Sequence, residues 1–324
     1  MIRIFFGMSL GMALLAADVP EATLKNEALK VVFHLPDAVN GSYRGARFDW
    51  SGVVKSLSFG KHEYFGVWYD KHDPLHHDAI TGPAEEFLSE EGALGFDEAK
   101  VGGNFVRIGI GALRKDQDAK FERFGRYTVV NPGKWTVSQK KDRIVFRQDL
   151  MDVSSGYGYR YEKTVRLVGG KAEMRIEHRL RNMGKKAIHA ENYNHNFFVI
   201  DGEPTGPNLS VRFGFAAKPK TDLAPLAAFQ DSRLNYNTEL KHGQTVMSEF
   251  TGFGADASSY DFRVENRKSG AGVHITGNRP LSKVIFWSIR RVLSPEPYIK
   301  MDIEPGGEFS WAIRYDFYEL SPGT

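Results

Sequence analysis

The stretch Tyr159–Asn182, YRYEKTVRLVGGKAEMRIEHRLRN, decides the fold class of this 324-residue chain. On both sides of Gly169-Gly170, apolar side chains occupy every second position, and charged or polar ones mostly fill the positions between. The apolar positions are Tyr161, Val165, Leu167, Ala172, Met174, Ile176 and Leu180. Alternation with a period of two is typical of a strand with one buried face, and two such runs around a glycine pair predict a β-hairpin. His178 continues the apolar series, so we expect it at a half-buried core position rather than as a ligand.

Shorter runs of the same kind recur along the chain with turn residues between them. They cover residues 31–35, 105–110, 127–130, 144–150, 209–215, 260–265, 272–276, 284–289 and 309–318. Helical patterns are short, the best being residues 83–90 and 223–229, and each is too brief to organise a core. So many antiparallel strands bury their apolar faces only in stacked sheets or a closed barrel. We therefore predict an all-β fold, a large antiparallel β-sandwich, in one domain over residues 18–324.

Composition narrows the possible functions. The 43 Lys+Arg and 40 Asp+Glu give a net charge of +3, and no basic run carries interleaved aromatics, so we expect no nucleic-acid partner. The chain has no cysteine, which excludes disulfides, thiolate metal sites and a cysteine nucleophile. The chemistry therefore depends on oxygen and nitrogen groups.

The amino terminus has the pattern of a secretory signal peptide. One positive charge at Arg3 precedes the uncharged apolar run Ile4–Ala17, which ends in the small pair Ala16-Ala17. A retained membrane anchor is the alternative, but the run is shorter than the roughly 20 residues that a bilayer requires. We expect residues 1–17 to be cleaved, and the product to be periplasmic or secreted with no stable membrane span.

The segment Glu191–Phe198, ENYNHNFF, places amide, phenol and imidazole groups in what otherwise has the pattern of a strand. Alternation puts Tyr193, His195 and Phe197 on one face and Asn194 on the other. An imidazole titrates near neutrality, with an unperturbed pKa of about 6.5, so His195 could transfer protons to or from a sugar. A core histidine bonded to nearby backbone is the alternative.

Near the carboxyl terminus, Glu296 stands between two prolines, which restrict its backbone as a positioned base requires. The alternative is a rigid surface loop with this glutamate in solvent. Glu304 precedes Pro305-Gly306-Gly307, which is typical of a hairpin turn before the last strand. The choice between Glu296 and Glu304 as base stays open.

These segments together resemble the aldose 1-epimerase, or galactose mutarotase-like, superfamily. The resemblance lies in NHNFF at 194–198, Glu296-Pro297, PGGE at 305–308, GALGFD at 92–97 and RGAR at 44–47. It spans most of the chain after residue 17. It implies a β-sandwich with a concave active face, where His195 acts as general acid and Glu296 as general base on a sugar. It also implies that neither a cofactor nor a metal is needed.

The chain departs from that family at Glu91, where the family usually has its first histidine, and it lacks the early arginine element that contacts sugar. The expected ligand is a small-molecule or oligosaccharide carbohydrate. One alternative function is an exported carbohydrate-binding protein without turnover. Another is a polysaccharide lyase or glycosidase, for which Arg44, Arg47 and Tyr43 could supply a cationic clamp and a base.

The loop HDPLHHD at residues 72–78 is a second candidate site. Its imidazoles and carboxylates could bind a divalent metal, contact sugar hydroxyls or lie in solvent, although its spacing matches no known metal motif. We assign no metal there. The side chains that we expect around the sugar are Arg47, His72, His77, Glu85, Glu86, Tyr193, Asn194 and Trp287.

Overall fold

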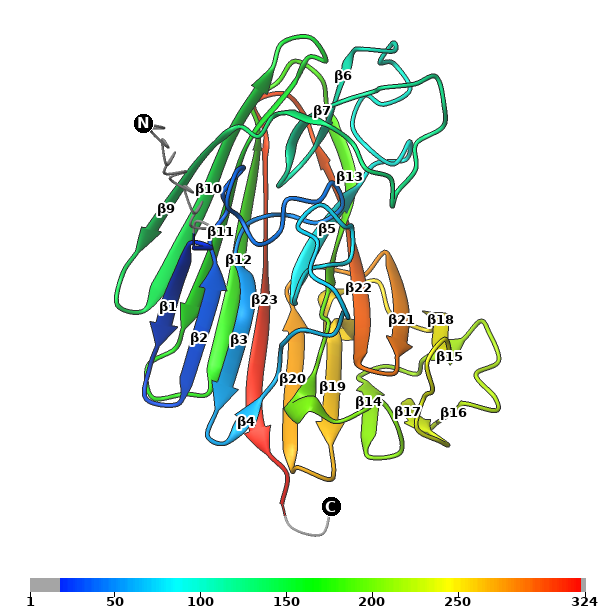
Figure 1. Ribbon diagram of the computed structural model, residues 1–324. Coiled ribbons are helices and arrows are strands. Elements are labelled where there is room, and N and C mark those ends of the chain that lie inside the picture. Colours follow the sequence, from blue (N-terminus) through cyan, green and yellow to red (C-terminus); the bar gives the residue numbers. More distant parts are fainter. Residues whose placement is uncertain (1–17, 322–324) are drawn as a thin grey trace, which may run out of the picture.

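The computed structural model describes residues 18–321 and is built from antiparallel strands (Figure 1). The largest sheet has ten strands in the order β16-β17-β14-β19-β20-β23-β12-β11-β10-β9. Their bounds are β9 Lys134–Gln139, β10 Arg143–Asp152, β11 Tyr157–Leu167, β12 Glu173–Asn182, β14 Leu209–Phe213, β16 Ala227–Gln230, β17 Arg233–Tyr236, β19 Asp261–Asn266, β20 Ala271–Gly277 and β23 Glu308–Glu319.

A six-stranded sheet has the order β15-β18-β21-β22-β13-β5. Its strands are β5 Ala84–Leu88, β13 Ile188–His195, β15 Lys218–Pro219, β18 Thr245–Thr251, β21 Lys283–Ile289 and β22 Val292–Ile303. Two smaller sheets hold β1 Glu21–Lys25, β2 Leu29–His34, β3 Val53–Phe59 and β4 His62–Glu63, and β6 Asn104–Arg107, β7 Gly111–Arg114 and β8 Val129–Asn131. The described 3₁₀ turns are η1 Ile200–Gly202 and η2 Ala257–Ser259.

The predicted hairpin and sandwich are confirmed. Strands β11 and β12 pair with Val165 opposite Ile176, and their apolar faces enter one large core. The ten-stranded sheet forms one layer, while the β1–β4 sheet and the six-stranded sheet together form the other. Phe33 of β2 packs on Phe146 of β10 at 6.0 Å between ring centroids, which joins the two layers at one end of the core.

Both helical patterns were wrong. Residues 83–90 contain strand β5, and residues 223–229 contain a turn that leads into β16. Strand β5 escaped detection because residues 84–87 are all buried, so its sequence lacks the alternation of a half-solvated strand. Its two glutamates also gave the segment a polarity that is unusual for a buried strand.

The six-stranded sheet is covered on both faces, and this arrangement positions the candidate site. One face packs against the ten-stranded sheet. The other lies under a second cluster of buried aromatic and aliphatic side chains, which includes Phe48, Trp68, Tyr193, Phe197 and Tyr298. We call this second side the outer face.

The predicted signal peptide, residues 1–17, lies outside the described residues. Within residues 18–321, no helix has both the length and the apolar character needed to cross a bilayer.

Candidate active site

Strand β13 presents its side chains to two different environments, as the alternation predicted. Tyr193 and His195 point to the outer face, where the His195 ring stacks on Phe197 with centroids 3.6 Å apart. Asn194 points the opposite way and donates to Tyr315 Oη of β23 at 3.4 Å, inside the sandwich. Strand β13 lies between β5 and β22, so the outer face brings side chains of all three strands together.

His195 and Glu296 meet on this outer face. His195 Nε2 lies 3.1 Å from Glu296 Oε1, and the two residues are 4% and 5% exposed. Glu296 belongs to strand β22, so the alternative of a surface loop was wrong. Glu304 lies exposed in the turn between β22 and β23. The carboxylate beside the imidazole is therefore that of Glu296.

Burial sets the protonation of the pair. It raises the pKa of Glu296 to about 8, against the lowering effect of Arg47 and Arg123. Burial also lowers the pKa of His195 well below its usual value, and the positive charge of Arg47 lowers it further. At neutral pH these shifts favour a protonated carboxyl and a neutral imidazole. The site therefore places a proton donor and a proton acceptor in contact.

Glu86 of β5 organises the charges beside the pair. It accepts hydrogen bonds from Arg47 Nε at 2.9 Å, Arg107 Nη2 at 2.9 Å and Arg123 Nη2 at 2.7 Å, and from Tyr193 Oη at 2.6 Å. Burial alone would raise the pKa of Glu86, but Arg47 and Arg123 hold it well below its usual range. A fully buried carboxylate is stable here because guanidinium donors surround it.

The neighbouring Glu85 lies on the other face of β5, away from His195. Its carboxylate pairs with Lys163 Nζ and lies 2.9 Å from His178 Nε2, inside the sandwich. Asn194 Nδ2 donates to it at 3.2 Å. The structure thus separates Glu85 and Asn194 from the other predicted sugar contacts. His178 is a core residue as predicted, but it is fully buried rather than half-buried.

The loop at residues 72–78 reaches the site through its last residues. Asp78 pairs with Arg47, and His77 Nε2 lies 3.1 Å from Asp78 Oδ2. His72 instead lies exposed, with Nε2 2.8 Å from the carbonyl oxygen of Ser42. Among residues 18–321, no three His, Asp or Glu side chains converge as a metal-ligand set.

The remaining predicted contact, Trp287 of β21, packs its ring edge-on to His195 at 5.2 Å. Arg107 and Arg123 were missed, because nothing in their loop and strand sequences marks them as partners of Glu86. Glu91 acts within its own loop. Its carboxylate accepts from the backbone N–H groups of Gly95 at 3.0 Å and Asp97 at 2.8 Å.

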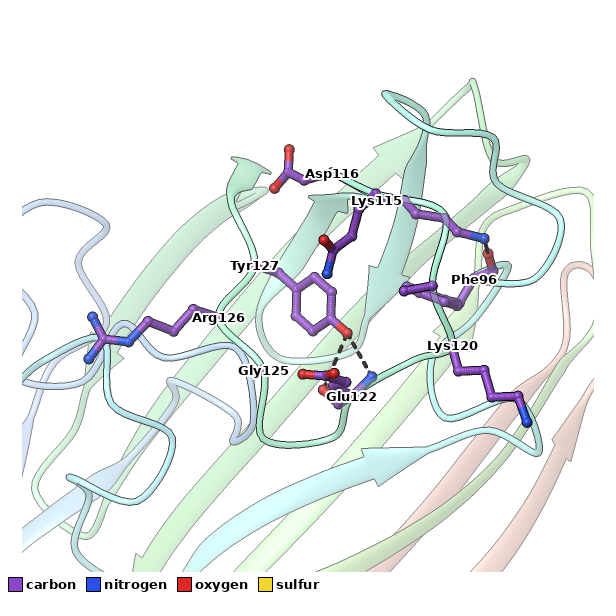
Figure 2. Close-up of a pocket in the computed structure, with 10 residues that line it drawn as sticks. Phe96, Lys115, Asp116, Lys120, Glu122, Gly125, Arg126 and Tyr127 are labelled. Atoms are coloured by element: carbon purple, nitrogen blue, oxygen red, sulfur yellow. Dashed lines mark hydrogen bonds between the residues drawn. The ribbon is translucent and has the colours of Figure 1, made fainter.

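Three cavities lie near these loops, one of them a cleft of about 420 Å³ lined in part by Glu91. A small one of about 90 Å³ sits within residues 96–127, where Tyr127 Oη accepts from the Glu122 backbone N–H at 2.8 Å (Figure 2). It contains no predicted site residue. A cleft of about 360 Å³ is lined by Trp68, Tyr69, Asp70, Lys71, Asp73, His76 and Asp78. His195 and Glu296 line none of the three, and both side chains are buried.

Comparison with solved structures shows that the fold is that of galactose mutarotase-like proteins. Slr1438 protein from Synechocystis sp. PCC 6803 matches 96% of this chain and 99% of its own, with a TM-score of 0.57 and 12% identity. A galactose mutarotase-like protein from Clostridium acetobutylicum matches 95% and 98%, with a TM-score of 0.57 and 11% identity. Galactose 1-epimerase from Lactobacillus acidophilus NCFM matches 93% and 95%, with a TM-score of 0.54 and 11% identity. No protein-family model and no curated protein sequence matches the chain.

Proposed function

We propose that this protein is a carbohydrate epimerase that interconverts the anomers of a sugar, and that it acts after export. The proposal depends on the contact between His195 and Glu296, a buried imidazole and a buried carboxyl whose nitrogen and oxygen lie 3.1 Å apart. The mutarotase-like fold supports it. Anomer exchange needs one group to protonate the ring oxygen and another to remove the proton of the anomeric hydroxyl.

The two side chains can supply both transfers. The mechanism uses the state in which the proton of Glu296 has moved to His195, giving an imidazolium and a carboxylate; because burial raises the pKa of Glu296 and lowers that of His195, this is the minor state in the free protein. His195 then protonates the ring oxygen while Glu296 takes the proton of the anomeric hydroxyl, and the ring opens to an aldehyde. Rotation about the C1–C2 bond and closure with the roles reversed give the other anomer. Each transfer contributes roughly 10²–10⁴-fold to the rate.

Carbohydrate binding without turnover is the second candidate. It is favoured by the direct contact of the pair, since a sugar has to separate His195 from Glu296 before either can act on it. A lyase receives no such support. Tyr43, its candidate base, donates to the carbonyl oxygen of His77 at 3.0 Å, and burial raises its pKa far above the neutral range.

An NMR assay of anomer exchange tests the proposal. Purified protein is mixed with neutral, uronic and deoxy sugars, and exchange is compared with that of His195→Asn and Glu296→Gln. We expect acceleration of at least one sugar and a loss of about 100-fold or more in both variants, in line with the value of a single proton transfer. Glu304→Gln is the matched control, because this exposed glutamate stands eight positions along the same chain segment and should leave the rate unchanged. Full activity in either site variant contradicts the mechanism, and binding without acceleration supports the second candidate.

A further inference from the structure

The cleft at residues 68–78 adjoins the candidate pair through a stack of three rings. Trp68 lines the cleft and stacks on Phe197 with centroids 5.1 Å apart, and Phe197 stacks on His195 at 3.6 Å. Asp78 also lines the cleft and pairs with Arg47, which reaches Glu86 and Tyr193. The cleft is therefore connected to the His195–Glu296 pair by the ring stack of Trp68, Phe197 and His195. The ion pair of Asp78 with Arg47 makes a second connection.

Two aromatic rings give this cleft a rigid corner. Trp68 and Tyr69 meet at 75° with centroids 6.0 Å apart. The Trp68 indole is held in place because its Nε1 donates to the carbonyl oxygen of Ile80 at 2.9 Å. Trp68 is only 8% exposed, so the half-buried ring of Tyr69 is the aromatic surface that the apolar C–H face of a pyranose could contact. A volume of about 360 Å³ accommodates a sugar unit.

The charged groups of the cleft nearly balance one another. Lys71 and His76 line it together with three aspartates, and each aspartate is paired with an arginine from another part of the chain. The pairs are Asp70 with Arg291, Asp73 with Arg126, and Asp78 with Arg47. The pairing offsets the negative charge of the aspartates, and their carboxylate oxygens remain hydrogen-bond acceptors. Sugar hydroxyl groups can donate to these carboxylates and accept from the Lys71 ammonium, so an uncharged ligand suits both.

We propose that this cleft is a subsite for a neutral sugar unit, so that the substrate is a neutral oligosaccharide whose reducing end reaches His195 and Glu296. The identity of the reducing-end site rests on the proposed function. The subsite itself does not, because binding of a sugar unit in the cleft requires no turnover.

Binding of blocked glycosides tests the subsite. Methyl β-lactoside, methyl β-maltoside and methyl β-cellobioside are compared with methyl β-galactoside and methyl β-glucoside by NMR saturation transfer and titration. Their anomeric carbons cannot exchange, so affinity is measured without catalysis. We expect at least one disaccharide to bind about tenfold more tightly than either monosaccharide. A uronate-containing disaccharide is measured beside them. Equal affinity for mono- and disaccharides, or tighter binding of the uronate than of every neutral disaccharide, overturns the subsite.

Tyr69 carries the matched variants. Tyr69→Ala should weaken disaccharide binding about tenfold and leave monosaccharide binding unchanged, while Tyr69→Phe keeps the ring and should bind as the wild type. Asp70→Ala removes an acceptor from an exposed position, where misfolding is not a concern, and should weaken disaccharide binding in the same selective way. Disaccharide binding unaffected by both Tyr69→Ala and Asp70→Ala overturns the proposal.

The experiments distinguish failure of the proposed epimerase activity from failure of the proposed subsite. If the protein exchanges no anomers but Tyr69→Ala selectively weakens disaccharide binding, the subsite stands and the epimerase activity falls. If it exchanges anomers but binds mono- and disaccharides equally, the epimerase activity stands and the subsite falls.

Discussion

Burial of Glu296 makes the stability of the folded protein depend on pH. Its pKa is raised from 4.5 to about 8 by burial, so between these pH values the folded protein binds a proton that the unfolded chain has released. Stability therefore falls as pH rises through this window, by about 1.4 kcal/mol per pH unit from this group. We expect Glu296→Gln, which keeps the shape of the neutral carboxyl, to raise the melting temperature more at pH 8 than at pH 5. Thermal unfolding at both pH values measures this, and an equal shift at both would show that Glu296 is ionised in the folded protein.

At the same scale, the sequence placed His195 correctly and left Glu296 undecided. Alternation along β13 is a local property, so the face of His195 follows from its neighbours. Pro295 and Pro297 argue against a central strand because proline lacks the N–H that a ladder needs. Strand β22 is nevertheless central, but at Pro295 and Pro297 it pairs only with β21, because its register with β13 ends at Tyr298. The Pro295 carbonyl oxygen accepts from the side chain of Asn196 at 2.7 Å. That contact joins residues 99 positions apart, and local sequence carries no signal of it.

At the scale of elements, the segment of residues 116–126 contacts the outer face through hydrogen bonds of Arg123. This side chain bonds Glu86 and also Tyr193 Oη at 2.7 Å, while Phe124 stacks on His77 at 5.0 Å. We expect Arg123→Gln to loosen the segment and to speed amide hydrogen exchange in residues 116–126 by about tenfold, because an opening that costs about 1.4 kcal/mol less is tenfold more populated.

Arg126 gives the matched control for that experiment. It lies in the same segment and pairs with Asp73, but the two side chains are 61% and 37% exposed. Exposed ion pairs contribute little to stability, so Arg126→Gln should leave exchange nearly unchanged. Equal protection in wild type and Arg123→Gln would mean that Phe124 and its neighbours hold the segment without the arginine. Sequence alone did not indicate these contacts, because the partners of Arg123 and Phe124, which are Glu86, Tyr193 and His77, lie in other parts of the chain.

At the scale of the whole molecule, the hydrophobic pattern was sufficient to predict the architecture. It did not predict the charged side chains that pair between the two layers inside the core. Alternating apolar positions in many strands require two layers, and two layers were found. Lys163, however, occupies an inward position of β11 between Tyr161 and Val165, where a lysine is unexpected. It is accommodated because β5, from the opposite layer, brings Glu85 to it. The match of these two positions depends on how the layers stack, which no single strand specifies.

The buried charged groups Asp49, Glu85 and Lys163 connect the two layers of the sandwich. Burial raises the pKa of Asp49 to about 6 and would also raise that of Glu85, but Lys163 and His178 lower the pKa of Glu85 below its usual value. Replacing Lys163 leaves Glu85 as an uncompensated buried charge. We expect Lys163→Met to lower the free energy of unfolding by about 3–5 kcal/mol, the usual result of removing one partner of a buried pair.

Urea unfolding of a double-mutant cycle measures the coupling. In Lys163→Met/Glu85→Gln the Glu85 charge is gone and the neutral amide still accepts from Asn194 Nδ2, while Asp49, 3.6 Å from the lysine nitrogen in the wild type, stays in both backgrounds. The double variant should therefore lose less stability than the sum of the two single variants, by about 1–3 kcal/mol. Strictly additive losses would show that Lys163 and Glu85 stabilise the sandwich independently, through their packing rather than their charges. In that case the tie between the layers would reside in the apolar core alone.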